Sequence, residues 1–319
     1  MINADLNSLI NGILKSDRRS IARAISYAEG ADREVKKEML ARLYNHTGKS
    51  QIVGITGPPG IGKSTLIGNV ASIMSDMGYK VAILAIDASS PYTGGSLLGN
   101  RIRMQEALNQ KNIYMRSLAN RGARGGLSES SIGATAILDA AGFDIVLVET
   151  VGAGQADLDV MDLADTIVLV LGPGLGDQVQ AIKAGIMEIA DLFVINKMDR
   201  DGSYFAMKDI EDTLSMDEVR QFKRQVVGTS IKEKESYKSL IELIDLHGKY
   251  LREKGQIGQK RFKMGIQWML EDEMRIKIID PLMSQIPANS KNENYYNVLE
   301  RVSEFFAKVV EEIRNEKLI

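Results

Sequence analysis

The chain has 319 residues, and 44% of them are hydrophobic, which is enough to bury a large core and to carry additional segments. Its 40 Lys and Arg residues nearly balance its 42 Asp and Glu residues, so no overall charge favours nucleic acid or an acidic membrane as the main partner. The sequence contains no cysteine and only two histidines, which excludes disulfides and thiolate metal sites and leaves the oxygen-preferring Mg²⁺ as the expected metal.

The N-terminal segment is predicted to be helical. Residues 5–46 are mixed in charge, and apolar residues such as Ile21, Ile25 and Ala28 recur at helical spacing. We therefore expect residues 1–48 to form a helical N-terminal extension whose simplest role is packing. The sequence has no basic start followed by an apolar stretch and no run of about 18 uncharged apolar residues, so we expect a soluble, cytoplasmic protein.

Between residues 49 and 250, short β-branched runs alternate with longer helical stretches. Apolar strands separated by helices predict an α/β fold with a doubly wound, mostly parallel sheet that helices cover on both faces. In such sheets the ligand lies beyond the carboxyl ends of the strands, so the polar residues that end the strands gather at one edge. The predicted strands are residues 52–56, 81–86, 145–148, 167–171 and 192–195.

A phosphate-binding loop follows the first predicted strand and opens a helix. Its glycines allow backbone N–H groups to turn toward phosphate oxygens, and the helix N-terminus adds positive potential. Lys63 is expected to reach the β- and γ-phosphates as a catalytic residue, and Ser64 is expected to ligate Mg²⁺. The residues predicted to bind nucleotide here are Gly57, Pro58, Pro59, Gly60, Ile61, Gly62, Lys63, Ser64 and Thr65.

The segment Asn196-Lys197-Met198-Asp199 follows an apolar strand, at the position expected for a guanine-reading loop. The carboxylate of Asp199 can accept from both N1–H and the exocyclic amine of guanine, whereas adenine presents no such pair of donors. Two charged hydrogen bonds of about 1.5–3 kcal/mol each would give a roughly 10²- to 10⁴-fold preference for guanine. These residues are ordinary turn formers when they occur alone. With the phosphate-binding loop at the same sheet edge, they predict a site for GTP and GDP.

Two acidic residues end neighbouring strands and are predicted to face the phosphates. Asp87 follows the second strand and Glu149 the third. Each is expected to hold Mg²⁺ directly, to hold it through water, or to orient the attacking water, and these roles stay open. The backbone N–H of Gly152 is expected to donate to the γ-phosphate. The alternative for either acid is to cap the next helix.

Two glycine-rich segments, residues 93–96 and 122–126, lie between the predicted strands. Glycine-rich backbone can move at low cost when the γ-phosphate leaves, so these segments predict a switch. Arg121 and Arg124 flank or lie within the second segment, and we interpret them as part of a solvated or anion-binding loop rather than as catalytic residues.

The sequence after residue 250 is basic and then helical, which predicts a separate C-terminal segment over residues 251–319. Val298, Val302, Phe305 and Val309 recur at spacings of four, three and four residues and form one helical stripe. Packing on its own domain and contact with a second copy are both open interpretations of this stripe.

Taken together, the motifs resemble those of the MeaB/ArgK family, the P-loop GTPase chaperones of adenosylcobalamin-dependent acyl-CoA mutases such as methylmalonyl-CoA mutase. The resemblance covers most of the chain. Its most specific part is residues 140–155, because Glu-Thr-Val-Gly stands at residues 149–152 where a generic GTPase has Asp-x-x-Gly. The other segments that carry it are residues 57–65, 87–90, 101–104 and 196–199.

The resemblance implies a homodimer with a helical N-terminal arm and a C-terminal dimerisation extension. It also implies a role in loading or protecting the cofactor of the mutase. Intrinsic GTP hydrolysis is expected to be slow, because a partner commonly completes the positioning of the attacking water. A switch loop that couples nucleotide to mutase is implied at residues 174–178, with Lys183 downstream. A second guanine contact is implied at Ser230.

The chain departs from the family pattern at three places. Asn100 stands where the family has Asp before its basic pair, so the Mg²⁺ arrangement or the switching response is expected to differ. The base-binding turn reads Gly-Thr-Ser-Ile-Lys-Glu at residues 228–233 instead of Thr-Ser-Ala-x-x-Gly. The histidine common in the family's glycine-rich loop is absent around Ala123.

Three other functions are alternatives for this sequence. For an ATPase or GTPase of an amino-acid (LAO/AO-type) transport system, no segment resembles a membrane-docking surface, and Asp199 disfavours adenine and therefore the ATPase. A metal-insertion GTPase would need soft ligands, and the sequence has no cysteine and two widely separated histidines, His46 and His247. A small-molecule kinase remains conceivable, although no acceptor-binding motif stands out.

Overall fold

The computed structural model describes residues 2–30, 32–88, 110–120, 129–150, 161–174, 186–216 and 221–284, together with residues 296, 300, 303 and 307. The chain divides into two compact units, Met1–Met264 and Gly265–Ile319. Within the described ranges, no helix combines the length and the apolar character needed to cross a lipid bilayer.

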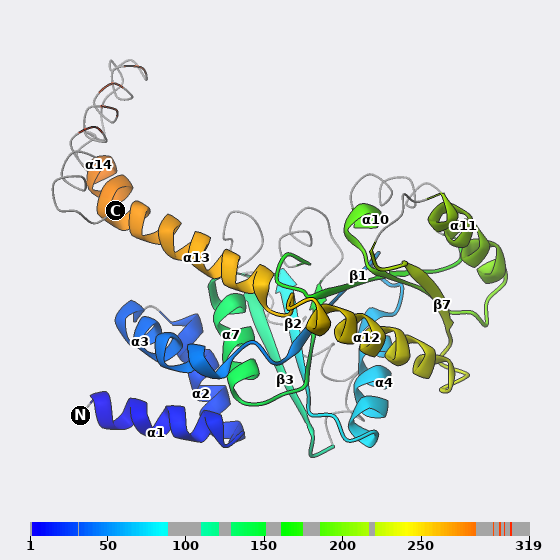
Figure 1. The fold of residues 1–319 in the computed structure, drawn as a ribbon, viewed down its shortest axis with the longest axis horizontal. Helices are drawn as coiled ribbons and strands as arrows, with labels where there is room; N and C mark the ends of the chain where they lie inside the picture. Colours follow the sequence, from blue (N-terminus) through cyan, green and yellow to red (C-terminus); the bar gives the residue numbers. More distant parts are fainter. Residues whose placement is uncertain are drawn as a thin grey trace. The chain divides into compact units, whose positions relative to one another are not determined.

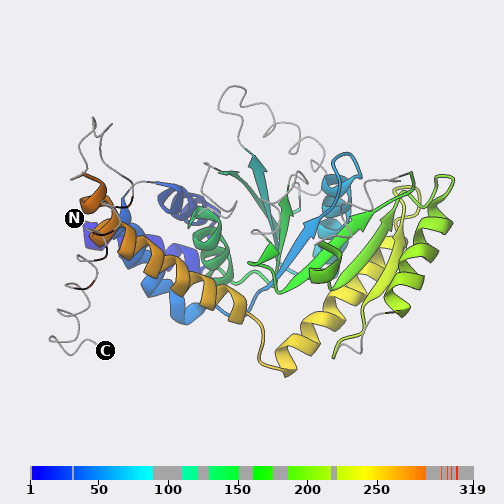
Figure 2. The ribbon, with the colours of Figure 1, turned by 90° about the horizontal axis from the view of Figure 1, so that it is seen from above.

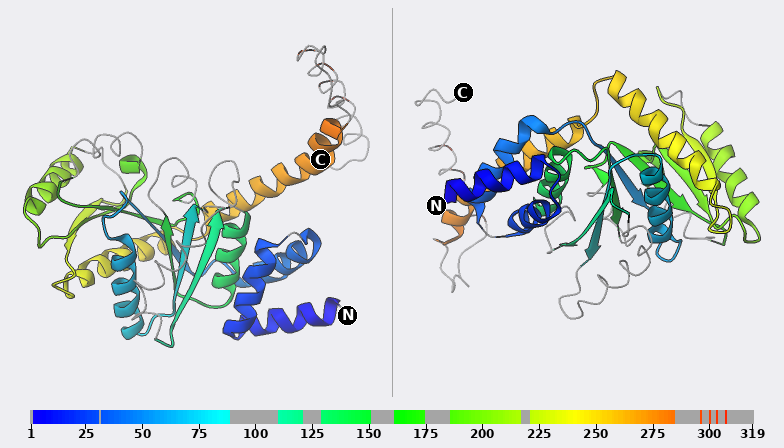
Figure 3. Two further views of the ribbon diagram at one scale, coloured as in Figure 1. Left: turned by 180° about the vertical axis from the view of Figure 1, so that it is seen from behind. Right: turned by 90° about the horizontal axis from the view of Figure 1, so that it is seen from below.

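One parallel sheet of seven strands forms the centre of the first unit, in the order β3-β2-β4-β1-β5-β6-β7 (Figure 1). The strands are parallel, as the arrows of β2 and β3 illustrate in Figure 3, so their carboxyl ends meet along one edge. The bounds are β1 Gln51–Thr56, β2 Val81–Ala88, β3 Ile113–Asn120, β4 Ile145–Thr150, β5 Thr166–Leu171, β6 Leu192–Asn196 and β7 Gln225–Thr229.

The predicted fold class is confirmed, and each of the five predicted strands ends within two residues of its expected position. The strands that the sequence did not reveal, β3 and β7, lie at the two edges of the sheet. β3 contains Arg116 in its interior, and four of the five residues of β7 are only partly buried. Edge strands need less apolar surface than central ones, so they lack the continuous hydrophobic runs by which the other strands were found.

Helices cover both faces of the sheet, and strand side chains alternate between the two. Ile52 packs in a cluster with α7 (Glu129–Ala140), α10 (Ile186–Ile189) and α11 (Ser203–Ser215). The next residue, Val53, packs in the opposite cluster with α4 (Lys63–Asp76) and α12 (Ser236–Glu253). This alternation, with period two, is what a parallel sheet buried on both faces requires.

Three N-terminal helices, α1 (Ile2–Leu14), α2 (Arg18–Glu29) and α3 (Arg33–Leu43), group around α7 (Figure 2). The side chain of Asp17 caps α2 by accepting from Ser20 N at 2.8 Å, and Asp32 caps α3 in the same way. Gly133 allows close approach, because a Cβ there would lie 3.1 Å from the Cβ of Ala28. These helices belong to the same compact unit as the sheet.

A buried carboxylate on α7 holds the segment that leads into the first strand. Asp139, near the end of α7, accepts hydrogen bonds from the backbone N–H groups of residues 48, 49 and 50 at 2.7–3.0 Å. It also lies 3.4 Å from a guanidinium nitrogen of Arg261. The segment that leads into β1 is therefore fixed by one charge-assisted cluster.

Replacing Asp139 with alanine should lower the free energy of unfolding by about 3–5 kcal/mol, because it leaves buried N–H donors and a buried guanidinium without this partner. Urea unfolding followed by circular dichroism measures the change. The exposed Asp212 on α11 is the matched control, and its alanine variant should lie within about 0.5 kcal/mol of the wild type. Equal transition midpoints for the two variants would contradict the proposed anchoring role.

The second unit begins within α13 (Gln259–Met274) and continues through a π-helical turn (Arg275–Ile279) and α14 (Asp280–Ser284). It exposes many large apolar side chains, namely Ile266, Met269, Leu270, Met274, Ile276, Ile279 and Met283. The stripe predicted farther along, at Val298, Val302, Phe305 and Val309, lies outside the described residues.

Candidate functional site

The predicted phosphate-binding loop lies at the carboxyl edge of the sheet, between β1 and α4. Gly57 has φ of 145°, and a Cβ there would lie 2.1 Å from the carbonyl oxygen of Val170. Gly62 has φ of 103°, and its Cβ would lie 2.7 Å from Nδ2 of Asn196. Both positions combine a left-handed backbone with close neighbours, so only glycine fits them.

Lys63 is the first residue of α4, and its side chain is buried inside this loop. Its ammonium donates to the carbonyl oxygens of Gly57 at 2.7 Å and Pro58 at 3.1 Å. The charge is thus held at the N-terminus of α4, where helix geometry already leaves N–H groups unpaired. Thr65, in the first turn, accepts from Asn69 through its backbone carbonyl.

Ser64 and Glu149 are brought into direct contact. The Ser64 hydroxyl donates to Oε1 of Glu149 at 2.5 Å, and both side chains are buried. Glu149 reaches this position because β4 pairs with β1, with Glu149 opposite Ile55. A hydroxyl and a carboxylate both offer oxygen ligands, which suit Mg²⁺. In the described ranges, no group of three or more His, Cys, Asp or Glu side chains is arranged to hold a metal ion.

Asp87 and Gly152 were also predicted to face the phosphates. The backbone of Asp87 lies in β2, one position beyond the Ile86–Thr150 pair and so at the same edge as Glu149. Its side chain is outside the described part of the structure, as are Gly152, the glycine-rich segments 93–96 and 122–126, and residues 175–185.

The loop after β6 is tied directly to the phosphate-binding loop. Asn196 donates from Nδ2 to the carbonyl oxygen of Ile61 at 2.9 Å, and Lys197 donates from Nζ to that of Gly60 at 2.8 Å. Lys197 has φ of 63°, a conformation that non-glycine residues seldom adopt. Two motifs more than 130 residues apart in the sequence therefore form one connected structure.

Asp199 is held by two donors from the turn after β7. Ser230 Oγ donates to Oδ1 of Asp199 at 2.8 Å, and Lys232 Nζ lies 3.2 Å from Oδ2. The Ser230 hydrogen bond, followed by the Lys232 contact, holds the pKa of Asp199 below its usual value of 3.8. The side chain is therefore a carboxylate near neutral pH, able to accept at both oxygens.

Two residues of this arrangement were not identified from the sequence. Thr229 donates from Oγ1 to Oδ1 of Asn196 at 3.0 Å, and Lys232 forms the ion pair with Asp199. Thr229 is the last residue of β7 and Lys232 lies in the turn that follows it, and β7 was not predicted from the sequence. If β7 had been recognised as the neighbour of β6, the pairing of Asn196 with Thr229 would have identified Thr229 as part of this arrangement.

A family model and the named relatives of this chain agree on one family of GTPases. The family model described as methylmalonyl Co-A mutase-associated GTPase MeaB matches residues 21–285. A protein of Pyrococcus abyssi named as a GTPase is 41% identical over 304 residues, covering 94% of this chain and 92% of the relative. The mitochondrial methylmalonic aciduria type A homolog of Mus musculus is 37% identical over 209 residues, covering 61% of this chain and 50% of its own.

Among solved structures, the crystal structure of a LAO/AO transport system kinase matches with a TM-score of 0.70. It covers 95% of this chain and 98% of its own, at 23% sequence identity. At this level of identity the match supports the fold and nothing more specific.

Proposed function

This chain belongs to the MeaB family of mutase-associated GTPases, and from that premise we propose that it is a switch that chaperones an adenosylcobalamin-dependent acyl-CoA mutase. Its enzyme class, a P-loop GTPase, follows from the family. The observation that carries the nucleotide-binding part of this proposal is the pair of hydrogen bonds from Asn196 and Lys197 to the phosphate-binding loop. They support the proposal that one site recognises both the base and the phosphates.

We assign the guanine base to the carboxylate of Asp199, with Ser230 as the residue that orients it. This assignment is supported by the Ser230–Asp199 hydrogen bond and by the lowered pKa of Asp199. The triphosphate is assigned to the backbone of residues 57–62 and to Lys63, which would exchange its carbonyl contacts for phosphate oxygens. Gly152 is the proposed N–H donor to the γ-phosphate.

Ser64, Asp87 and Glu149 are the residues that would hold Mg²⁺, and the buried Ser64–Glu149 pair supports this donor set. When bound, the ion supplies positive charge that neutralises the phosphate oxygens. In hydrolysis, water attacks the γ-phosphorus and the bond to the β–γ bridging oxygen breaks. Asp87 and Glu149 are the two candidates for orienting that water, and slow turnover of the isolated chain is expected while its position is incomplete.

The mutase is proposed as the partner that reads the nucleotide state. Support comes from the description of the family model, which names an association with methylmalonyl-CoA mutase, and from the name of the mouse relative. A homodimer is proposed as well. The exposed apolar side chains of the second unit support it, because a second copy would remove them from water.

Turnover of GTP should rise at least about tenfold when the cell's own adenosylcobalamin-dependent acyl-CoA mutase is added to the purified chain, because a partner commonly completes water positioning. Phosphate release measures the rate, and size-exclusion chromatography with GDP or a non-hydrolysable GTP analogue measures complex formation. A cobalamin-dependent enzyme of another class is the control. Absence of a complex and of stimulation in every nucleotide state would remove the chaperone proposal while leaving the GTPase assignment intact.

A further inference from the structure

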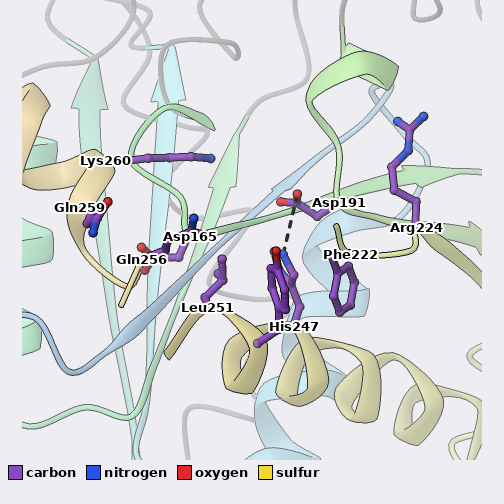
Figure 4. Close-up of a pocket in the computed structure, with 10 residues that line it drawn as sticks. Asp165, Asp191, Phe222, Arg224, His247, Leu251, Gln256, Gln259 and Lys260 are labelled. Atoms are coloured by element: carbon purple, nitrogen blue, oxygen red, sulfur yellow. Dashed lines mark ion pairs between the residues drawn. The ribbon is translucent and has the colours of Figure 1, made fainter. Parts of the chain in front are cut away.

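A cavity of about 360 Å³ lies at the amino edge of the sheet, on the side opposite the nucleotide site (Figure 4). Its lining comes from the residues that precede β5 and β6, from the segment before β7, from α12 and from the start of α13. The size falls within the roughly 300–1,000 Å³ of small-molecule sites. All the lining residues belong to the first compact unit.

Three rings form one wall of this cavity. The ring centroid of Phe222 lies 4.5 Å from that of His247 and 5.3 Å from that of Tyr250. His247 and Tyr250, one turn apart on α12, are stacked with 14° between their planes. Phe222 and Tyr250 are partly exposed and offer an aromatic surface backed by the buried His247 ring, such as binding sites for small organic molecules commonly use.

A carboxylate lies beside this wall. Oδ2 of Asp191 accepts from the backbone N–H of Ile167 at 2.8 Å, whereas Oδ1 faces His247 Nε2 at 3.9 Å, beyond hydrogen-bond distance. Burial lowers the pKa of His247 below its usual 6.5, so the ring is neutral at pH 7. The negative charge of Asp191 is therefore available to a cationic group in the cavity.

An ammonium lies on another side of the cavity. Lys260 extends toward the cavity in Figure 4, and its Nζ lies 3.4 Å from the carbonyl oxygen of Ala164. In the described part of the chain no carboxylate lies within 4.0 Å of it. The ammonium is therefore available to an anionic group.

The other two charged residues of the lining are engaged elsewhere. Asp165 accepts from the backbone N–H groups of Ile52 and Gly258, both at 2.9 Å, and lies near Arg261. Arg224 donates to the carbonyl oxygen of Met187 at 2.6 Å, and its guanidinium points away from the His247 ring in Figure 4. One carboxylate and one ammonium are left to face a ligand.

We propose that this cavity binds a small zwitterion, of the class of free α-amino acids with an aromatic side chain. Its ammonium would pair with Asp191, its carboxylate with Lys260, and its ring would pack on the wall of Phe222, His247 and Tyr250. The ligand would bridge α12 and α13 across the turn that joins them, residues 254–258, which is called the elbow below. Its glycines Gly255 and Gly258 have φ of 63° and 77°. Binding is thus expected to reduce the motion of this elbow. None of the residues assigned to GTP takes part in this binding.

The test titrates the full-length chain, loaded with GDP, with L-phenylalanine by isothermal calorimetry. Two half-ligands are titrated in parallel: 3-phenylpropionate, which lacks the ammonium, and 2-phenylethylamine, which lacks the carboxylate. L-phenylalanine should bind saturably and at least tenfold more tightly than either half-ligand. When L-phenylalanine is bound, amide hydrogen exchange at residues 254–259 should slow, because the ligand would oppose local opening of the elbow.

Two variants locate the site. Lys260→Met and Asp191→Asn should each weaken L-phenylalanine binding at least tenfold, while Lys263→Met, which changes an exposed lysine one turn away on α13, should not. Asparagine keeps an oxygen for the Ile167 N–H, and unchanged GDP affinity with an unchanged circular dichroism spectrum verifies folding. The proposal is overturned if L-phenylalanine shows no saturable binding, if a half-ligand binds equally well, or if both folded variants bind like the wild type.

Discussion

Replacing Lys63 with alanine is expected to abolish tight GTP binding, with the dissociation constant rising about 10²- to 10⁴-fold. Hydrogen bonds from a charged donor contribute about 1.5–3 kcal/mol each, and this ammonium is predicted to contact two phosphate groups. The structure adds a reason for the large effect, since Lys63 already lies buried within the loop, at 2.7 Å from the Gly57 carbonyl oxygen. Little side-chain ordering is left to oppose binding.

The measurement is a fluorescence titration with a labelled GTP analogue, and GDP is titrated in the same way. Lys80→Ala, which removes an exposed lysine ahead of β2 at the opposite edge of the sheet, is the control and should bind like the wild type. If Lys63→Ala bound GTP within threefold of the wild type while remaining folded, the phosphate-binding role of this loop would be wrong.

The central part of the fold could be predicted from the sequence because its signals are local. The strands β1, β2, β4, β5 and β6 are buried on both faces and consist of nearly continuous apolar residues. The glycines of the phosphate-binding loop could be identified for a similar reason, since the backbone geometry at Gly57 and Gly62 excludes other residues.

Other features depend on contacts that no local pattern carries. β7 is a short segment with little apolar sequence signal, and it forms a strand because residues 225–229 pair with the neighbouring β6. The role of Lys232 depends in turn on β7, which places the following turn beside Asp199. The anchoring of Asp139 could not be predicted either, because its partners lie 89–91 residues away in sequence.

The cavity at the amino edge was even harder to predict from the sequence. Its lining residues come from five separate segments between Asp165 and Lys260, and each reads in sequence as an ordinary surface or packing residue. The sequence drew attention only to His247, and then as one of two histidines too distant to bind a metal. Only the fold reveals that this ring lies between Thr166, Phe222 and Tyr250.

Exchanging Asp199 for asparagine is expected to convert a GTP-binding protein into one that prefers xanthosine triphosphate. The amide presents one donor and one acceptor in place of two acceptors, so it repels one of the two guanine donors but complements the carbonyl that xanthine carries at the same position. GTP affinity should fall about 10²- to 10⁴-fold, since two charged hydrogen bonds are lost or weakened. Competition titrations with GTP, XTP and ATP measure the preference.

The surroundings of Asp199 determine how the asparagine would lie. Ser230 donates to Oδ1, which favours the orientation that keeps the amide oxygen there and places the amide nitrogen where Oδ2 now faces Lys232. The Lys232 ammonium would then lose its partner, and because this side chain is largely exposed it can turn toward solvent at little cost. Asp201→Asn, two residues farther along the same loop, is the control and should keep the wild-type preference for GTP. An Asp199→Asn protein that still selected GTP over XTP would show that the base is read elsewhere, and the guanine site would have to be sought outside the loops after β6 and β7 that carry Asp199 and Ser230.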